Sequence, residues 1–108
     1  MRRTTIGATH AGWRVMGHRV EVLFLRDETD RTPAHRLRND GTIVRIPLGQ
    51  PGFIGFDQRA PPDLAQAREW FPRHFRLWDA VRTQFWDVVL HRHATPSAAR
   101  TQTGRRPG

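Results

Sequence analysis

Apolar and polar positions alternate most clearly in residues 18–26, a run rich in strand-forming side chains. Val20, Val22 and Phe24 are predicted to share one face, while Glu21 shares the other face with two leucines. Because both faces are partly apolar, the pattern predicts a central or well-covered strand.

A tight-turn signal, Asn-Asp-Gly, follows at residues 39–41, where each residue type tolerates positive φ. The flanking segments 34–38 and 42–47 are predicted as the two strands of a hairpin. Together with residues 18–26 they give an antiparallel meander of three strands. Residues 53–56 fit either a fourth, short edge strand or a buried plug between glycines and prolines.

Helical periodicity begins after a Pro-Pro-Asp sequence, with a short helix predicted over residues 63–71. Pro72 either kinks this helix or begins a second one. Residues 73–93 place apolar side chains over about half of a helical wheel. The sequence therefore predicts an α+β fold, in which a small antiparallel three- to four-stranded meander is covered by a kinked C-terminal helix or helix pair. The apolar arc contains Phe75, Leu77, Trp78, Val81, Phe85, Trp86, Val88 and Val89.

The two ends of the chain lack this periodicity. Residues 1–12 are predicted to form a flexible basic N-terminal arm, residues 13–93 a single domain, and residues 94–108 a disordered basic tail without large apolar side chains. The formal net charge is +8, and all ten acidic residues lie between positions 20 and 93. This distribution favours arms that contact phosphates over a basic groove. The arginines assigned to these arms are Arg2, Arg3, Arg100, Arg105 and Arg106.

Every one of the 18 basic side chains is arginine. Arginine suits bidentate contacts with phosphate, but a GC-rich genome produces the same bias, and both explanations stay open. Cysteine is absent, which excludes a disulfide scaffold, a thiolate nucleophile and cysteine-ligated metal. We expect no cofactor and no metal. No apolar run is long enough for a signal peptide or a membrane span, so a cytoplasmic protein without membrane contact is expected.

One candidate binding site lies on the predicted C-terminal helix. Trp78, Arg82 and Trp86 are spaced four residues apart and are expected to stack along one helix face. As a structural feature, this is an arginine stem packed between two indoles. As a functional feature, it is a platform on which a nucleobase, a peptide or an anionic ligand stacks.

A second candidate site is catalytic. Glu21 is the sole acid within its strand, and burial there raises a carboxyl pKa toward the range of a general base. His18 or His35 on the same sheet is a potential acid partner. The structural alternative is that Glu21 pairs with Arg19, Arg36 or Arg45 across a strand.

Three functions are compatible with these features. The first is a small basic binding module that contacts nucleic acid or another polyanion through its arginine-bearing arms and the Trp/Arg helix face. The second is a protein-interaction or accessory subunit, a homo- or hetero-oligomer, because four tryptophans and six phenylalanines are many for a thin sheet to bury. The third is a small metal-independent His/Glu enzyme, such as a nuclease or a lyase. The sequence favours a binding protein over an enzyme.

Overall fold

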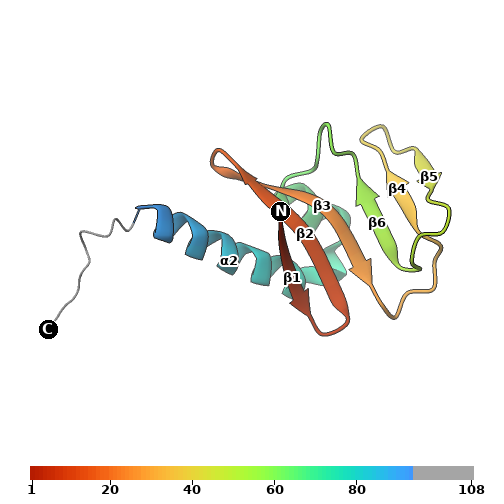
Figure 1. The fold of residues 1–108 in the computed structure, drawn as a ribbon, viewed down its shortest axis with the longest axis horizontal. Helices are drawn as coiled ribbons and strands as arrows, with labels where there is room; N and C mark the ends of the chain where they lie inside the picture. Colours follow the sequence, from red (N-terminus) through yellow and green to blue (C-terminus); the bar gives the residue numbers. More distant parts are fainter. Residues whose placement is uncertain (94–108) are drawn as a thin grey trace, which may run out of the picture.

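The computed structural model describes residues 1–93, which form an α+β fold, as predicted. A single six-stranded sheet carries its helices on one face (Figure 1). The strands are β1 (Arg2–Ile6), β2 (Thr9–Met16), β3 (Arg19–Asp27), β4 (His35–Leu37), β5 (Ile43–Arg45) and β6 (Phe53–Phe56). The helical segments are α1 (Leu64–Trp70), the short 3-10 turn η1 (Pro72–His74) and α2 (Phe75–His93).

The order of the strands differs from a meander. It is β1-β2-β3-β6-β4-β5, and all neighbours are antiparallel except β4 and β6, which run parallel. The predicted hairpin at residues 39–41 is confirmed as β4 and β5, with Gly41 at a φ of 87°. However, β6 lies between this hairpin and β3. The predicted count of three or four strands was therefore too low, and β6 is an interior strand, neither an edge nor a plug.

The N-terminal segment is also different from the prediction. Residues 1–12, expected to be a flexible arm, form β1 and the first half of β2 around a turn at Gly7 (φ 58°). Thr4 is almost fully buried. Its Oγ1 accepts a hydrogen bond from Trp13 Nε1 (2.8 Å) and donates one to Gln84 Oε1 on α2 (2.6 Å). The segment is thus an integral edge of the fold. The predicted tail, residues 94–108, lies outside the described residues.

A β-bulge in β3 changes which side chains share a face. Trp13 pairs with Val22, but the preceding residue, Gly12, pairs with Phe24, so Leu23 is an extra residue in the ladder. Beyond the bulge the alternation is inverted. Phe24 therefore projects away from Val22, on the side of the sheet without helices, and Leu25 joins the buried residues. The prediction that Phe24 shares a face with the two valines was wrong.

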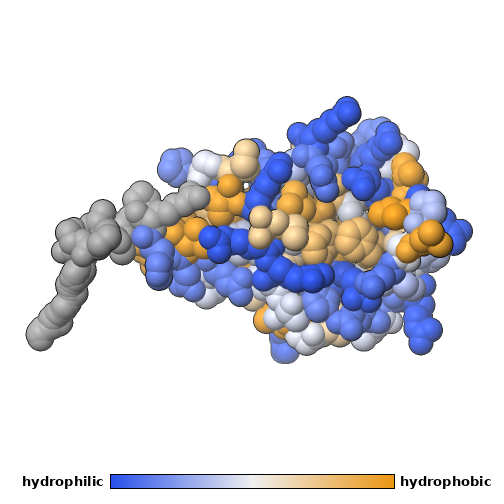
Figure 2. All heavy atoms as spheres, viewed as in Figure 1, coloured by the Kyte–Doolittle hydropathy of each residue, from blue (hydrophilic) through white to orange (hydrophobic). Residues whose placement is uncertain are grey.

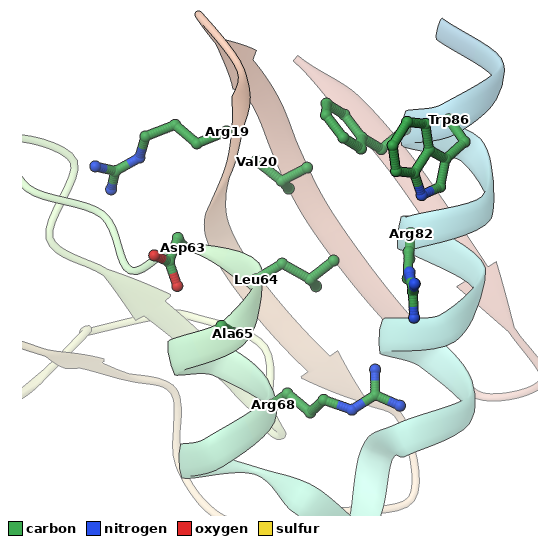
Figure 3. A pocket seen from close by; sticks show the side chains of 9 residues that line it. Arg19, Val20, Asp63, Leu64, Ala65, Arg68, Arg82 and Trp86 are labelled. Carbon is green, nitrogen blue, oxygen red and sulfur yellow. The ribbon is translucent and has the colours of Figure 1, made fainter. Parts of the chain in front are cut away.

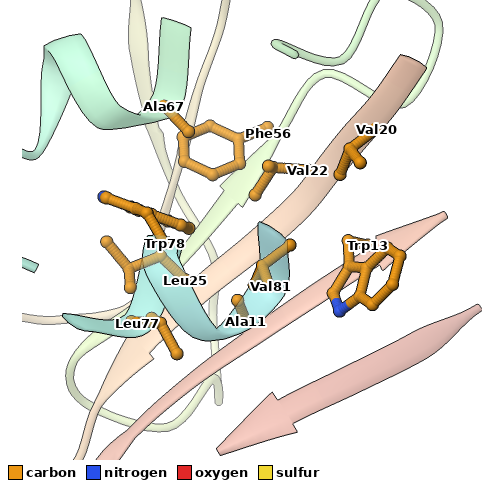
Figure 4. Close-up of a cluster of buried hydrophobic side chains, with 10 residues drawn as sticks. All are labelled: Ala11, Trp13, Val20, Val22, Leu25, Phe56, Ala67, Leu77, Trp78 and Val81. Carbon is orange, nitrogen blue, oxygen red and sulfur yellow. The ribbon is translucent and has the colours of Figure 1, made fainter. Parts of the chain in front are cut away.

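The core lies between the sheet and the helices (Figure 4). Asp63 caps α1, because its side chain accepts the Gln66 backbone N–H while the Gln66 side chain accepts the Asp63 N–H. Pro72 begins η1, which joins the two helices. The buried apolar residues of this cluster are Ala11, Trp13, Val20, Val22, Leu25, Phe56, Ala67, Leu77, Trp78 and Val81.

Helix α2 covers the sheet with its first half and runs past the edge of the sheet with its second half (Figure 1). Trp86 and Leu90 are 50% and 60% exposed. Phe75, which the predicted apolar arc includes, is also exposed. It lies at the start of α2, beside the turn that joins the end of β1 to the start of β2. Within residues 1–93, none of the helices combines the length and the apolar composition needed to cross a bilayer.

Candidate functional site

The predicted Trp/Arg face of α2 is divided between the core and the surface. Trp78 is fully buried, and its Nε1–H donates to the Phe71 carbonyl (2.9 Å), so it cannot act as a stacking platform. Arg82 and Trp86 are exposed and line one groove. The structure therefore brings two of the three predicted residues together and assigns the third to scaffold.

The groove lies between α1, α2 and the start of β3 (Figure 3). Val20, Leu64 and Phe85 give it apolar walls beside the Trp86 indole. Polar side chains complete it, and they are Arg19, Asp63, Arg68 and Arg82.

The N-terminal arginines lie on opposite faces of the sheet. Arg2 is on the helix side, with its guanidinium 6.0 Å from the centre of the Trp13 ring. Arg3 is on the other side, 5.4 Å from the centre of the Phe24 ring. The two therefore do not form one arm. The remaining arginines assigned to the arms (Arg100, Arg105 and Arg106) lie outside the described residues.

The candidate catalytic residues are not brought together. Glu21 Oε1 accepts a hydrogen bond from Arg14 Nε (2.9 Å), and its other oxygen is 3.8 Å from Arg19 Nη2. Arg19 was one of the predicted partners, whereas the closer partner, Arg14, was not predicted. His18 is exposed in the turn between β2 and β3. His35 on β4 has its Nδ1 3.0 Å from the Pro33 carbonyl oxygen. Within residues 1–93, no hydrogen bond links Glu21 to either histidine, and no group of three or more His, Asp and Glu side chains is arranged to hold a metal ion.

A second surface is the face of the sheet that no helix covers, here called the open face. Residues directly opposite each other in a ladder share a face. One such row crosses all six strands, from Arg3 through Gly12, Phe24, Gly55 and Arg36 to Val44. A parallel row runs from Thr5 through His10 and Arg26 to Phe53.

Two aromatic rings occupy the centre of the open face. Phe24 and Phe53 are stacked, with ring centres 5.3 Å apart and planes at 27°. The Phe24 ring lies directly over Gly12, where a Cβ atom would approach it to 2.1 Å. The Phe53 ring similarly lies 3.2 Å from the place of a Cβ on Gly55. The two glycines therefore allow the rings to lie close against the sheet.

Arginines surround this aromatic pair. Arg3, Arg26 and Arg36 form no ion pair within residues 1–93. The Nε–H of Arg26 is buried without an acceptor among the described residues, an arrangement that normally costs about 1–3 kcal/mol. Figure 2 shows this side of the molecule, where an apolar band crosses the sheet between hydrophilic side chains.

Two acids near the open face have basic partners. Glu21 is held by Arg14 and Arg19, and Glu28 accepts a short hydrogen bond from His10. The His10 hydrogen bond is the main cause that lowers the pKa of Glu28 below its usual value. The two rows that cross the open face contain three arginines and no acid, so their formal charge is positive.

Sequence reasoning missed the open face as a site. It placed Phe24 on one face with Val20 and Val22, assigned Arg3 to an arm, and considered residues 53–56 as either a short edge strand or a buried plug. The signal present in the sequence is the pair of glycines, Gly12 and Gly55, within apolar segments. Such glycines indicate close approach to the backbone, but their partner rings can be named only when the strand register is known.

The chain matches no known family model, and searches of curated proteins and of solved structures find no significant match.

Proposed function

We propose that this protein binds single-stranded nucleic acid on the open face of its sheet. The observation that carries the proposal is the row Arg3–Gly12–Phe24–Gly55–Arg36, in which an aromatic surface lies between two arginines that have no ion-pair partner among residues 1–93. The proposal keeps the class of ligand expected from the basic sequence and places the contact on a different surface. A cytoplasmic location is part of the same proposal.

The dimensions of this row suit a short stretch of one strand. Neighbouring β-strands lie about 4.8 Å apart, so the four steps from β1 to β4 separate Arg3 and Arg36 by about 19 Å. A strand crossing the sheet would place bases on the Phe24 and Phe53 rings and phosphates beside the arginines. Each stacked base contributes about 1–3 kcal/mol.

Single strands are favoured over duplexes because stacking on a protein ring requires an unpaired base. Arg26 supports the same assignment. Its Nε–H has no acceptor in the described part of the chain, and a phosphate or base oxygen would supply one if the side chain turned toward the ligand.

The test compares two double variants with equal loss of charge. Arg3→Gln/Arg36→Gln removes arginines from the open face, whereas Arg59→Gln/Arg76→Gln removes them from a loop and from α2. Binding of a fluorescein-labelled 12-mer of deoxythymidine is measured by anisotropy at several salt concentrations. For single strands the logarithmic salt slope is about 0.7 per phosphate contact, so the open-face variant should lose about 1.4 from its slope and at least about tenfold in affinity.

The control pair should retain the slope of the parent protein. Equal losses in the two pairs would show a non-specific charge effect and would overturn the proposal. A Phe53→Leu variant tests stacking separately, with an expected loss of about five-fold or more. Tighter binding of a duplex or of heparin than of the 12-mer would reject the single-stranded assignment.

A second candidate function, a homo-oligomeric or accessory subunit, is favoured by a different observation. Trp86 and Leu90 on the projecting half of α2 are half exposed or more, and Ile43 and Leu48 near the β5 edge are also exposed. Exposed apolar side chains of this kind are common at protein interfaces. Light scattering over a hundred-fold range of concentration tests it, and a monomer throughout would reject self-association.

A further inference from the structure

The groove between α1, α2 and the start of β3 has the size of a small-molecule site. Its volume is about 380 Å³, within the usual range of about 300–1,000 Å³ for ligand pockets. It lies on the side of the sheet opposite to the open face, because Val20 in its wall projects to the helix-covered face while Phe24 projects to the other. The two surfaces are therefore independent.

The groove has an apolar end and a cationic end (Figure 3). Trp86 lies at one end near Val20, and the Arg68 and Arg82 guanidinium groups lie toward the other end. The Trp86 indole packs on the Phe85 ring, with ring centres 5.7 Å apart, and remains half exposed. It thus offers a flat apolar surface that the fold itself does not cover.

The charged side chains of the groove differ in the partners that they have within the fold. Arg68 donates to Asp79 at 2.5 Å, and Arg19 is 3.8 Å from Glu21. The Asp63 carboxylate accepts the Gln66 backbone N–H at 2.8 Å as the cap of α1. Arg82 has no ion pair within residues 1–93. Among the groove arginines, Arg82 is thus the one without an acidic partner within residues 1–93, and it lies one helical turn from Trp86.

We infer that this groove binds a small organic anion with a flat apolar body. The anionic head, a carboxylate, sulfonate or phosphate, pairs with Arg82, and the apolar body lies against Trp86 and Leu64. Arginine is suited to such a head because its planar fork gives two parallel hydrogen bonds. The inference goes beyond nucleic-acid binding and does not depend on it.

The experiment titrates the protein with naphthalene-2-sulfonate and follows the indole N–H signals by NMR. Each of the four tryptophans gives one signal, and Trp86→Phe and Trp70→Phe variants assign the two exposed ones. We expect the Trp86 signal to shift, while those of Trp13 and Trp78, which are buried and hydrogen-bonded, stay in place. The probe has about fourteen non-hydrogen atoms, and at the usual binding energy per atom we expect a Kd of about 1 mM.

Two controls separate the charge from the apolar contact. Arg82→Gln should raise the Kd at least about tenfold, as expected when a charged hydrogen bond is lost, while Arg76→Gln on the same helix should leave it unchanged. Neutral naphthalene-2-sulfonamide should bind at least about tenfold more weakly than the sulfonate. Thermal unfolding of both variants checks that the fold is retained.

Three results would overturn the inference: a shift of Trp70 in place of Trp86, an unchanged Kd in Arg82→Gln, or equal binding of the neutral probe. Binding of the deoxythymidine 12-mer should be unaffected by Arg82→Gln. The two sites can therefore fail separately, since Arg3→Gln/Arg36→Gln should leave the naphthalene probe bound.

Discussion

The two faces of the sheet both carry aromatic rings, but the rings are used differently. On the helix-covered face, Trp13 and Phe56 are fully buried under α1 and α2 within one cluster. On the open face, Phe24 and Phe53 lie close to glycines, remain partly exposed, and have arginines beside them. Burial in the core is sufficient to explain the aromatic side chains of the helix-covered face.

Burial does not explain the open face to the same degree. A protein that needed only to protect this face would gain nothing from arginines around an apolar band that have no ion pair within residues 1–93. The combination of aromatic rings and neighbouring guanidinium groups is instead typical of surfaces that bind single strands. The comparison therefore separates aromatic residues that hold the fold together from those available to a ligand.

The largest effect is expected on the covered face. Trp13→Ala removes a fully buried indole and should lower the free energy of unfolding by about 3–5 kcal/mol, the usual cost of such a truncation. Urea unfolding measures it. Arg36→Gln on the open face should change stability by less than about 0.5 kcal/mol, and similar losses in the two variants would contradict the distinction between the faces.

A smaller effect is expected where a ring of the open face meets the backbone. Gly12→Ala places a Cβ within 2.1 Å of the Phe24 ring, so the ring must move, and overpacking of this kind costs about 1–3 kcal/mol. In a Gly12→Ala/Phe24→Leu double variant the two effects should be less than additive, because the branched side chain leaves more room. Full additivity would show that the ring does not lie over Gly12.

The link between β1 and α2 gives a further test. Thr4→Val leaves the buried Trp13 Nε1–H without its acceptor and should cost about 1–2 kcal/mol. Thr5→Val, at the neighbouring exposed position, should cost less than about 0.5 kcal/mol. If neither change alters urea unfolding, residues 2–6 do not form the edge of the sheet.

The smallest effect concerns pH. Burial lowers the pKa of His74, in the 3-10 turn before α2, although Asp27 nearby acts in the opposite direction. The unfolded chain, with a histidine pKa of about 6.5, then takes up a proton more readily than the folded one. Stability from this group is complete above about pH 6.5 and is lost as the pH falls toward the folded-state pKa.

His74→Gln should therefore flatten the pH dependence of the urea midpoint between about pH 7.5 and pH 5.5. His18→Gln is the matched control, because His18 is exposed in a turn. A steeper dependence in His74→Gln than in the parent protein would contradict the direction of the shift.

Elements with strong local signals were predicted well. Residues 19–27 form the expected strand, Asn39-Asp40-Gly41 forms the expected turn, and α2 ends at the expected residue. The N-terminal hairpin was missed because Thr4 and Ala11 carry little apolar surface. Thr4 is buried with hydrogen bonds to Trp13, nine residues away, and to Gln84 on α2, 80 residues away.

The candidate site was predicted less well than the fold. Periodicity grouped Trp78 with Trp86, but the sheet ends beneath α2, so the first is buried and the second exposed. Likewise, a single extra residue at Leu23 moved Phe24 from the face of Val20 and Val22 to the open one. The sequence of a single strand or helix does not reliably indicate how far the sheet extends or where a bulge occurs.

By itself, the sequence determined the net positive charge, the turn chemistry and the apolar stripe of the last helix, since these depend on residue type and on neighbours a few positions away. The tertiary structure decided which face of the sheet stays uncovered and which side chains meet there. The pairing of β6 with both β3 and β4, and the register that aligns Arg3, Phe24 and Arg36, come from hydrogen bonds between segments far apart in the chain. Such pairings are properties of two segments at once, so neither segment reveals them alone.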